Sequence, residues 1–395
     1  MRRLLTRCFS LRFGAVPLLA GSIMGAVLLG GCGGNTAEGP ITIGAIVSAT
    51  GAAAPLGAPQ RDTLAMMEKA INASGGVLGR ELRVVILDDQ SSAKEATTAV
   101  NRLLQQEKAV AILAASTSPS TLAVKPLTNK AGIPQIAMAA ANAITDEPPI
   151  EWLWRVAPKD NLAVARAMKY IAEELRVKKI AVLYDENAFG SSGMAEIERT
   201  QGDWGLEVVA TESYKTDETD LTAHLTKLNG VDPEVVVVWG TNPGPAVAAK
   251  NMRQLGMTVP YVGSHGIANA KFIELAGSAG EGVVLPTNKM VAVASITDPA
   301  MRQVVESFSA DYSAAYGQQP NPFAAYAHDA LAVVVAAVEA AGSTEPAALQ
   351  ARLNALTGFA GVGGVFNYTA GDHDGLSVED LVMVKIQSGK WVPVQ

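Results

Sequence analysis

Residues 112 to 142 read ILAASTSPSTLAVKPLTNKAGIPQIAMAAAN, and this stretch has the pattern strand, polar turn, helix, strand. The turn, Ser116–Thr121, is crowded with hydroxyl side chains, and Gly132-Ile133-Pro134 ends the helix before a second apolar run. Hydroxyls at a helix start accept hydrogen bonds from its free N–H groups. Those N–H groups and the helix dipole also attract a carboxylate or another anion. Plain capping and an anion site both fit this stretch, so the remaining chain must distinguish them.

The same alternation of strand and helix runs through most of the chain on either side. A strand that is apolar on both faces, such as Val235–Trp239, is typical of a parallel sheet covered by helices. The pattern predicts an α/β fold with two parallel-sheet units, in which ligands bind outside the carboxyl ends of the strands. After residue 298 three helices follow without a strand between them, and we expect them to pack on the first unit. The predicted strands cover 41–47, 82–87, 110–113, 135–138, 179–184, 208–214, 235–239, 261–263, 282–285, 364–368, 381–386 and 391–394. The predicted helices cover 60–72, 93–107, 122–130, 161–175, 190–201, 221–228, 245–255, 269–276, 299–316, 322–341 and 345–356.

The N-terminus has the composition of a secretory signal. Four arginines precede the apolar run Gly14–Leu29, which is short and interrupted for a membrane span. The segment Leu28-Leu29-Gly30-Gly31-Cys32 resembles the lipobox of bacterial lipoproteins. This resemblance implies a signal peptide at 1–31, a lipidated Cys32 and a tether over 32–40. It places the protein in the periplasm or at the cell surface, anchored to a membrane by acyl chains. An ordinary secretory signal with an incidental cysteine is the alternative.

The remaining chain is acidic and free of cysteine. The whole sequence has a net charge of −7, and loss of the four signal arginines makes the mature chain more acidic. An acidic body does not follow phosphate backbones, so nucleic acid is not an expected partner. Both cysteines, Cys8 and Cys32, lie in or at the end of the signal. None is therefore left in the mature domain for a thiolate metal site or a cysteine nucleophile.

The sequence contains no recognisable catalytic or metal-binding pattern. The four histidines are widely spaced, and the acidic turn Gly371–Gly375 lacks the closing glutamate of a calcium loop. Ser91-Ser92-Ala93-Lys94 matches the S-x-x-K of penicillin-recognising enzymes without their other two motifs, so a helix cap is the better interpretation. We therefore expect neither enzymatic activity nor a cofactor or a metal.

Several motifs together resemble those of periplasmic binding proteins of the branched-chain amino acid type, over Ile41–Val394. The matching segments are INASGGVLGR at 71–80 with Asp88-Asp89, Ser118-x-x-Thr121-Leu122-Ala123, Tyr184-Asp185-x-x-x-Phe189-Gly190, and Tyr326-Ala327-His328-Asp329-Ala330. The resemblance implies two Rossmann-like lobes joined by three crossings, the type I or flytrap fold. It further implies a monomer that closes over a small-molecule solute and presents it to the permease subunits of an ABC importer. The implied boundaries are 41–157 plus 288–358 for the first lobe and 158–287 plus 359–395 for the second.

The resemblance also implies which residues contact the ligand. Ser118 matches a serine that holds the ligand carboxylate, and Ala139 and Ala140 match backbone contacts on the following strand end. Phe189 matches an aromatic wall, Thr241-Asn242 a lining position of the second lobe, and Phe323 an aromatic residue at the pocket edge. For the two phenylalanines a place in the core is the alternative, and for Thr241-Asn242 a plain turn.

Two positions depart from the pattern of the leucine-binding relatives. Those relatives have a threonine at the position of Ala141 and a glutamate at the position of His265, and both hold the ammonium group of the ligand. A buried ammonium without such a partner costs about 2–5 kcal/mol. Within the broad class of amino acid-like and small carboxylate ligands, we therefore expect an organic or aromatic acid or an amide-like solute. We expect His265 to donate to a carboxylate and to bind more tightly when protonated. A solitary ligand sensor or regulatory lobe of the same fold is the alternative to an importer subunit.

Overall fold

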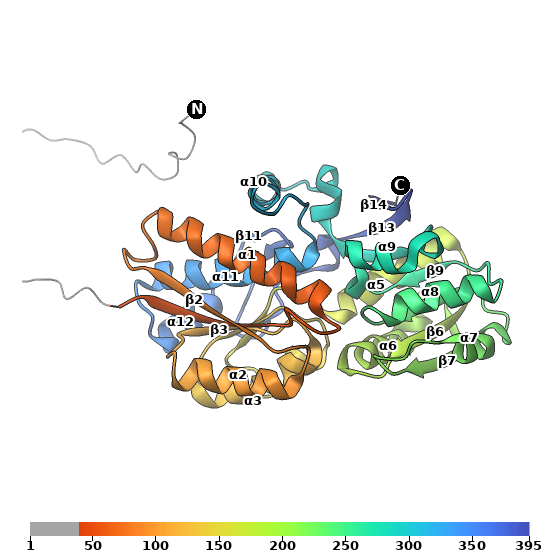
Figure 1. Ribbon diagram of the computed structural model, residues 1–395, viewed down its shortest axis with the longest axis horizontal. Coiled ribbons are helices and arrows are strands. Elements are labelled where there is room, and N and C mark those ends of the chain that lie inside the picture. The colour runs from red at the N-terminus through yellow and green to blue at the C-terminus, as the bar shows by residue number, and fades with distance from the viewer. Residues whose placement is uncertain (1–38, 395) are drawn as a thin grey trace, which may run out of the picture. The chain divides into compact units, whose positions relative to one another are not determined.

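Two β-sheets form the framework of residues 39–394, the part of the chain that the computed structural model describes (Figure 1). The strand order is β2-β1-β3-β4-β5 in the first sheet and β14-β13-β10-β9-β8-β6-β7 in the second. Helices cover both faces of each sheet, which confirms the predicted fold of two Rossmann-like α/β lobes. The predicted signal peptide and Cys32 lie outside the described residues.

The first lobe is built on five parallel strands. Helices α1, α11 and α12 pack on one face of this sheet, and α2 and α3 pack on the other (Figure 1). Strands β1 and β3 are buried along their whole length because both of their faces are covered. The bounds are β1 Ile41–Val47, α1 Ala54–Ala73, β2 Leu82–Asp88, α2 Ala93–Gln105, β3 Ala111–Ala114, α3 Ser118–Ala131, β4 Gln135–Ala137, α4 Ala143–Asp146, β5 Leu153–Arg155, α10 Pro299–Tyr316, α11 Pro322–Ala341 and α12 Pro346–Leu353.

The second lobe has a mixed sheet. Strands β6 to β10 are parallel, whereas β13 and β14 run antiparallel at one edge, which differs from the all-parallel prediction. Ser388 and Gly389 both have positive φ, as a tight two-residue hairpin turn requires, so the last two strands fold back on each other. The bounds are α5 Asp160–Tyr170, β6 Lys179–Asp185, α6 Ala188–Thr200, β7 Glu207–Tyr214, α7 Thr222–Asn229, β8 Val235–Trp239, α8 Gly244–Gln254, β9 Tyr261–Gly263, α9 Ala270–Ala276, β10 Val284–Asn288, β13 Leu381–Gln387 and β14 Lys390–Pro393.

The chain passes between the two sheets after β5, after β10 and before β13. Before the last passage, β11 (Phe359–Ala360) and β12 (Val365–Phe366) form a small hairpin of their own. Phe366 and Tyr368 are fully buried in the core of the first lobe, although the predicted boundary placed 359–395 in the second. Both belong to the same hydrophobic cluster as side chains of α11 and α12, the two helices that precede them in the chain. The exact lobe boundaries stay a prediction.

Helix α11 is the one helix among the described residues that is long and apolar enough to cross a membrane. Its mean hydropathy is 1.5, but 67% of the apolar window is buried inside the protein. Side chains on both sides of α11 pack against α1 and α12. It is therefore the central core helix of the first lobe.

Each sheet has one point where the connections leave neighbouring strands in opposite directions. In the first sheet this point lies between β1 and β3, and in the second between β6 and β8. Loops at the carboxyl ends of strands diverge there and leave a crevice, which is where ligands bind in open α/β sheets.

Candidate ligand-binding site

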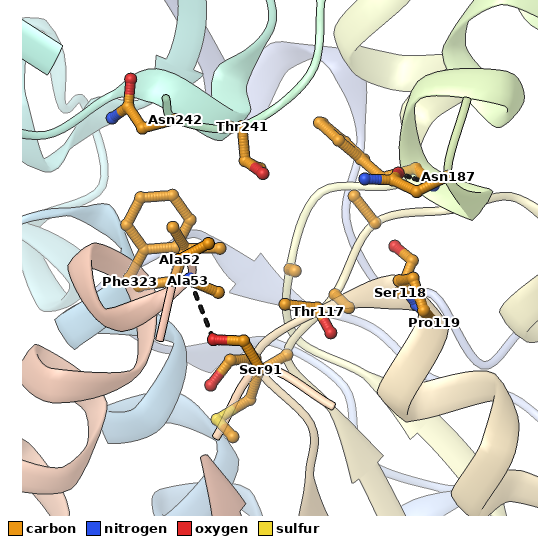
Figure 2. A pocket seen from close by; sticks show the side chains of 18 of the residues that line it. Ala52, Ala53, Ser91, Thr117, Ser118, Pro119, Asn187, Thr241, Asn242 and Phe323 are labelled. Atoms are coloured by element: carbon orange, nitrogen blue, oxygen red, sulfur yellow. Dashed lines mark hydrogen bonds between the residues drawn. The ribbon is translucent and has the colours of Figure 1, made fainter. Parts of the chain in front are cut away.

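A cavity of about 160 Å³ lies at these carboxyl ends and is lined by residues of both lobes (Figure 2). One water needs about 10–15 Å³ of such volume, so there is room for a solute of roughly ten non-hydrogen atoms. Figure 2 shows Ser118 and Asn187 at one end of the cavity and Phe323 and Asn242 at the other. The lining residues are Ala52, Ala53, Leu56, Ser91, Ser116, Thr117, Ser118, Pro119, Met138, Ala139, Ala140, Ala157, Asn187, Phe189, Thr216, Thr241, Asn242, His265, Gly266, Phe323 and Tyr326.

The structure brings all but one of the predicted site residues to this cavity. The residues that line it are Ser118, Ala139, Ala140, Phe189, Thr241, Asn242, His265 and Phe323. Ala141 does not line it, because its methyl group packs in a small apolar cluster with Ile144 and Leu153. Phe189 and Phe323 both line the cavity and pack into the hydrophobic cores of their lobes, so each ring is at once part of the cavity wall and part of a core. That these residues contact a ligand stays a prediction.

The first end of the cavity is rich in hydrogen-bond donors. Helix α3 begins at Ser118, after Thr117, whose hydroxyl accepts from the N–H of Ser120 over 3.4 Å. The Ser118 hydroxyl accepts from the N–H of Ala141 over 3.2 Å. Within residues 39–394, the N–H groups of Ser118, Ala139 and Ala140 have no hydrogen-bond partner. Capping therefore satisfies part of the helix start and leaves free N–H groups beside the cavity, where the helix dipole also favours an anion.

His265 lies in an aromatic corner of the second lobe. Its ring is 5.3 Å from that of Phe189 and 5.9 Å from that of Trp239, both in edge-on geometry. The residue is only 3% exposed, and neither ring nitrogen has a hydrogen-bond partner within the described chain. Burial, with a smaller effect of the nearby Arg155 charge, lowers the pKa of the ring to about 3. His265 is thus neutral at neutral pH in the ligand-free protein. The expectation that its protonation strengthens binding stays a prediction.

The second lobe fixes the polar side chains at the end of β6 through their own hydrogen bonds. The amide oxygen of Asn187 accepts from the N–H groups of Phe189 and Gly190, over 2.9 and 3.1 Å, and so caps α6. Its amide nitrogen donates to the Thr216 hydroxyl, which donates in turn to the buried Asp185 over 2.7 Å. Asn187 and Thr216 therefore present a fixed polar edge to the cavity.

Two other lining side chains have polar atoms without a partner in the described chain. They are the hydroxyl of Tyr326 and the amide oxygen of Asn242, in residues that are each 2% exposed. The amide nitrogen of Asn242 donates to Asn269 over 3.3 Å, which fixes the orientation of the side chain. Buried polar groups are costly when unpaired, so a bound solute that hydrogen-bonds with them is favoured.

The cavity wall carries no ionised side chain. No Asp, Glu, Lys or Arg is among the lining residues, and His265 is neutral. Within residues 39–394 no three His, Cys, Asp or Glu side chains lie close enough to hold a metal ion. What the wall offers is backbone N–H groups, hydroxyls, amides and aromatic rings.

Sequence reasoning missed several lining residues. Ser91 was interpreted as part of a helix cap, but its hydroxyl accepts from the N–H of Ala53 over 3.0 Å and so holds the loop after β1 against the cavity. Asn187, Thr216 and Tyr326 stand beside predicted motifs without belonging to the predicted site. The signal that could have identified most of them is their position directly after a strand, because every strand from β1 to β9 sends its following loop to this cavity.

Comparison with known proteins gives both a family and relatives. The sequence pattern of the family described as periplasmic binding protein matches residues 40–390. An amino acid binding protein of Pseudomonas aeruginosa is 29% identical over 341 residues, which cover 85% of this chain and 86% of that protein.

Solved structures share the fold as well, for example the following two. An extracellular ligand-binding receptor from Rhodopseudomonas palustris HaA2 superposes with a TM-score of 0.84 at 24% identity, covering 90% of this chain and 100% of that one. A solute binding protein of an ABC transporter from Rhodopseudomonas palustris BisB5, in complex with 3,4-dihydroxybenzoic acid, has a TM-score of 0.78 at 21% identity, with coverage of 90% and 96%.

Proposed function

The chain belongs to the periplasmic binding protein family, and on this premise we propose that it is the solute-binding subunit of an ABC importer for a small carboxylate that lacks a free ammonium group. The observation that carries the proposal is the wall of the cavity, which offers N–H donors at one end and no carboxylate anywhere. A carboxylate ligand gains from that wall, whereas an ammonium group finds no counter-charge.

The carboxylate is proposed to bind at Ser118. The free N–H groups of Ser118, Ala139 and Ala140 and the positive end of α3 meet there. Hydrogen bonds to a charged group are each worth about 1.5–3 kcal/mol. Several such donors hold an anion without any cationic side chain, as at other helix starts.

The rest of the ligand is proposed to be aromatic with a hydroxyl or amide group. Phe189 and Phe323 offer ring faces from the two lobes. The unpartnered atoms of His265, Asn242 and Tyr326 include both donors and acceptors, as a hydroxyl or an amide requires. The same fold in Rhodopseudomonas palustris BisB5 accommodates an acid of this kind, 3,4-dihydroxybenzoic acid.

An ordinary α-amino acid is the second candidate ligand. It is favoured by the Pseudomonas aeruginosa relative, whose description is an amino acid binding protein. At 29% identity the two chains share a family, while a single side chain at the ammonium site is enough to change the ligand. A solitary sensor or regulatory lobe is the alternative to an importer subunit.

We place the protein in the periplasm or at the cell surface, held to a membrane through lipid on Cys32 and acting as a monomer. The lipobox-like segment before Cys32 supports the anchor. Labelling with a radioactive fatty acid tests it: the wild-type chain is expected to incorporate label, and Cys32→Ala to incorporate none.

Thermal unfolding of the chain from residue 33 onwards tests the ligand class. The panel contains 4-hydroxybenzoate, benzoate, 4-hydroxybenzamide, short organic acids and leucine. A ligand at 100 times its dissociation constant adds about 2.7 kcal/mol to the folded state, enough to raise the melting temperature visibly. We expect aromatic acids to raise it and leucine to leave it unchanged. A shift with leucine and none with the acids contradicts the proposal.

A further inference from the structure

We infer that Arg155 and Asp374 form a positioning pair, which turns the peptide group between Ala139 and Ala140 so that the N–H of Ala140 serves an anionic ligand, and the next peptide group so that the N–H of Ala141 holds Ser118. Neither side chain lines the cavity. The inference rests on the proposed function in one respect, namely that the ligand carries a carboxylate.

Arg155 is completely buried at the end of β5, and one of its nitrogens donates to a single segment of backbone. Its Nη1 donates to the carbonyl oxygens of Ala140 over 2.7 Å, Ala141 over 3.0 Å and Ala139 over 3.4 Å. Its Nη2 donates to the hydroxyl of Thr145. Three successive carbonyl groups are therefore held by the same guanidinium, which does not line the cavity.

Because the peptide bond is planar, a contact that fixes the direction of a carbonyl group also fixes the direction of the next N–H group. In a trans peptide the carbonyl of one residue and the N–H of the next point in opposite directions. The carbonyl of Ala140 meets Arg155, and the N–H of Ala141 indeed points to the hydroxyl of Ser118 on the cavity wall. By the same geometry, the contact between Arg155 and the carbonyl of Ala139 turns the unpartnered N–H of Ala140 toward the cavity.

A turn from the far end of the chain holds Arg155 in this position. Its Nε donates to Asp374 over 2.9 Å, and Asp374 also pairs with Lys159 over 3.1 Å. The N–H of Arg155 donates to the carbonyl of His373 over 2.9 Å, and its carbonyl accepts from the Tyr368 hydroxyl over 2.7 Å. Burial alone would raise the pKa of the Asp374 carboxyl, but Arg155, Thr145 and Lys159 hold it below its usual value. The carboxylate is thus ionised, and Arg155 is held by both its side chain and its backbone.

The arrangement favours an anion in two ways. The N–H ends of oriented peptide dipoles carry partial positive charge toward the cavity, and a buried cation stands behind them where water does not screen it. The guanidinium is near enough to the cavity to act on the ring of His265. The cavity therefore gains selectivity for a carboxylate over an uncharged amide without presenting a charged side chain to the ligand.

The experiment compares an acid with its own primary amide in calorimetric titrations. The probe pair is 4-hydroxybenzoate and 4-hydroxybenzamide, and leucine with leucinamide is a second pair. The variant Arg155→Gln with Asp374→Asn removes both charges together and leaves no lone buried ion. We expect it to bind the acid at least tenfold more weakly than the wild type and the amide within threefold, so the preference for the acid falls. Lys159→Gln is the matched control, since Lys159 pairs with Asp374 but donates to none of the three carbonyls, and its preference is expected to stay within twofold.

A double variant that is folded and keeps the wild-type preference overturns the inference. If the double variant does not fold, Arg155→Lys decides, because it keeps the charge but cannot serve Asp374, Thr145 and three carbonyls at once. The acid preference is then expected to fall at least threefold, and an unchanged preference overturns the inference. A wild-type protein that prefers neither acid over its amide refutes the proposed function, and the inference falls with it. A wild-type preference that every variant keeps refutes the inference alone.

Discussion

Replacing His265 by glutamate should convert the cavity from one that excludes amines to one that accepts them. The residue is 3% exposed and faces the cavity between Phe189 and Trp239, so the new carboxyl would be buried without a partner. Asp160, a carboxyl buried close to the same Trp239, has its pKa raised by burial to about 7. A glutamate with a similar pKa would destabilise the empty protein by about 3 kcal/mol at pH 7. An ammonium group at this position would remove most of that cost.

The expected gain for leucine follows from this cost. Pairing a buried charge is worth about 2–5 kcal/mol, and recovery of the 3 kcal/mol above corresponds to roughly 100-fold in affinity. The same change should weaken 4-hydroxybenzoate, because two carboxylates would then share the cavity. Calorimetric titration at pH 7 measures both effects, and His265→Gln is the control of equal size without a charge. If His265→Glu gains no more leucine affinity than His265→Gln, the missing counter-charge is not what excludes amines, and the reasoning fails.

Three further changes separate stability from binding. His265 is neutral in the folded protein with a pKa of about 3, below its ordinary 6.5, so its contribution to stability is full above pH 6.5 and is lost as the pH falls. The unfolding free energy of the wild type, measured by urea denaturation, should therefore drop by about 2 kcal/mol more than that of His265→Gln between pH 7 and 5. Asp160 has the opposite pH dependence, since its pKa is raised to about 7 and the stability that it contributes is lost as the pH rises through that value. The unfolding free energy of Asp160→Asn should therefore gain about 2–3 kcal/mol over that of the wild type between pH 5 and 8, and a constant difference would contradict this. Tyr326→Phe removes a buried hydroxyl without a partner, so the melting temperature of the variant should match that of the wild type. Its affinity for 4-hydroxybenzoate should fall by up to about tenfold, and an unchanged affinity would show that this hydroxyl does not contact the ligand.

The fold could be predicted because its signals are local. Strand β8 (Val235–Trp239) and helix α11 (Pro322–Ala341) have the bounds that their apolar patterns predicted, and Pro at a helix start with Gly just past its end marks α10 and α11. The general place of the site follows too, since strands of a parallel sheet bring their carboxyl ends together. Helix α1 begins at Ala54, six residues before the predicted start, because Pro55 fits the first turn and Pro59 did not end the helix.

The rest of the site depends on contacts that no local pattern encodes. Arg155 and Asp374 are separated by 219 positions in the sequence, and only the third passage of the chain brings them together. The acidic turn at Gly371–Gly375 could be recognised as a turn, but not as the anchor of Arg155. Ala141 follows two cavity-lining alanines, yet it does not line the cavity itself, and its N–H donates to Ser118. The neutral state of His265 likewise reflects burial against two aromatic neighbours, Phe189 on α6 and Trp239 on β8.

The most direct test of the account is the affinity of the wild-type chain, unfolded and refolded to remove any solute carried through purification, for 4-hydroxybenzoate and for leucine. Isothermal titration at pH 7 should show the acid bound about 100-fold more tightly, the factor expected when one ligand leaves a buried ammonium unpaired. Leucine bound as tightly as the acid, or more tightly, would contradict the claim that this cavity selects a carboxylate without an amine.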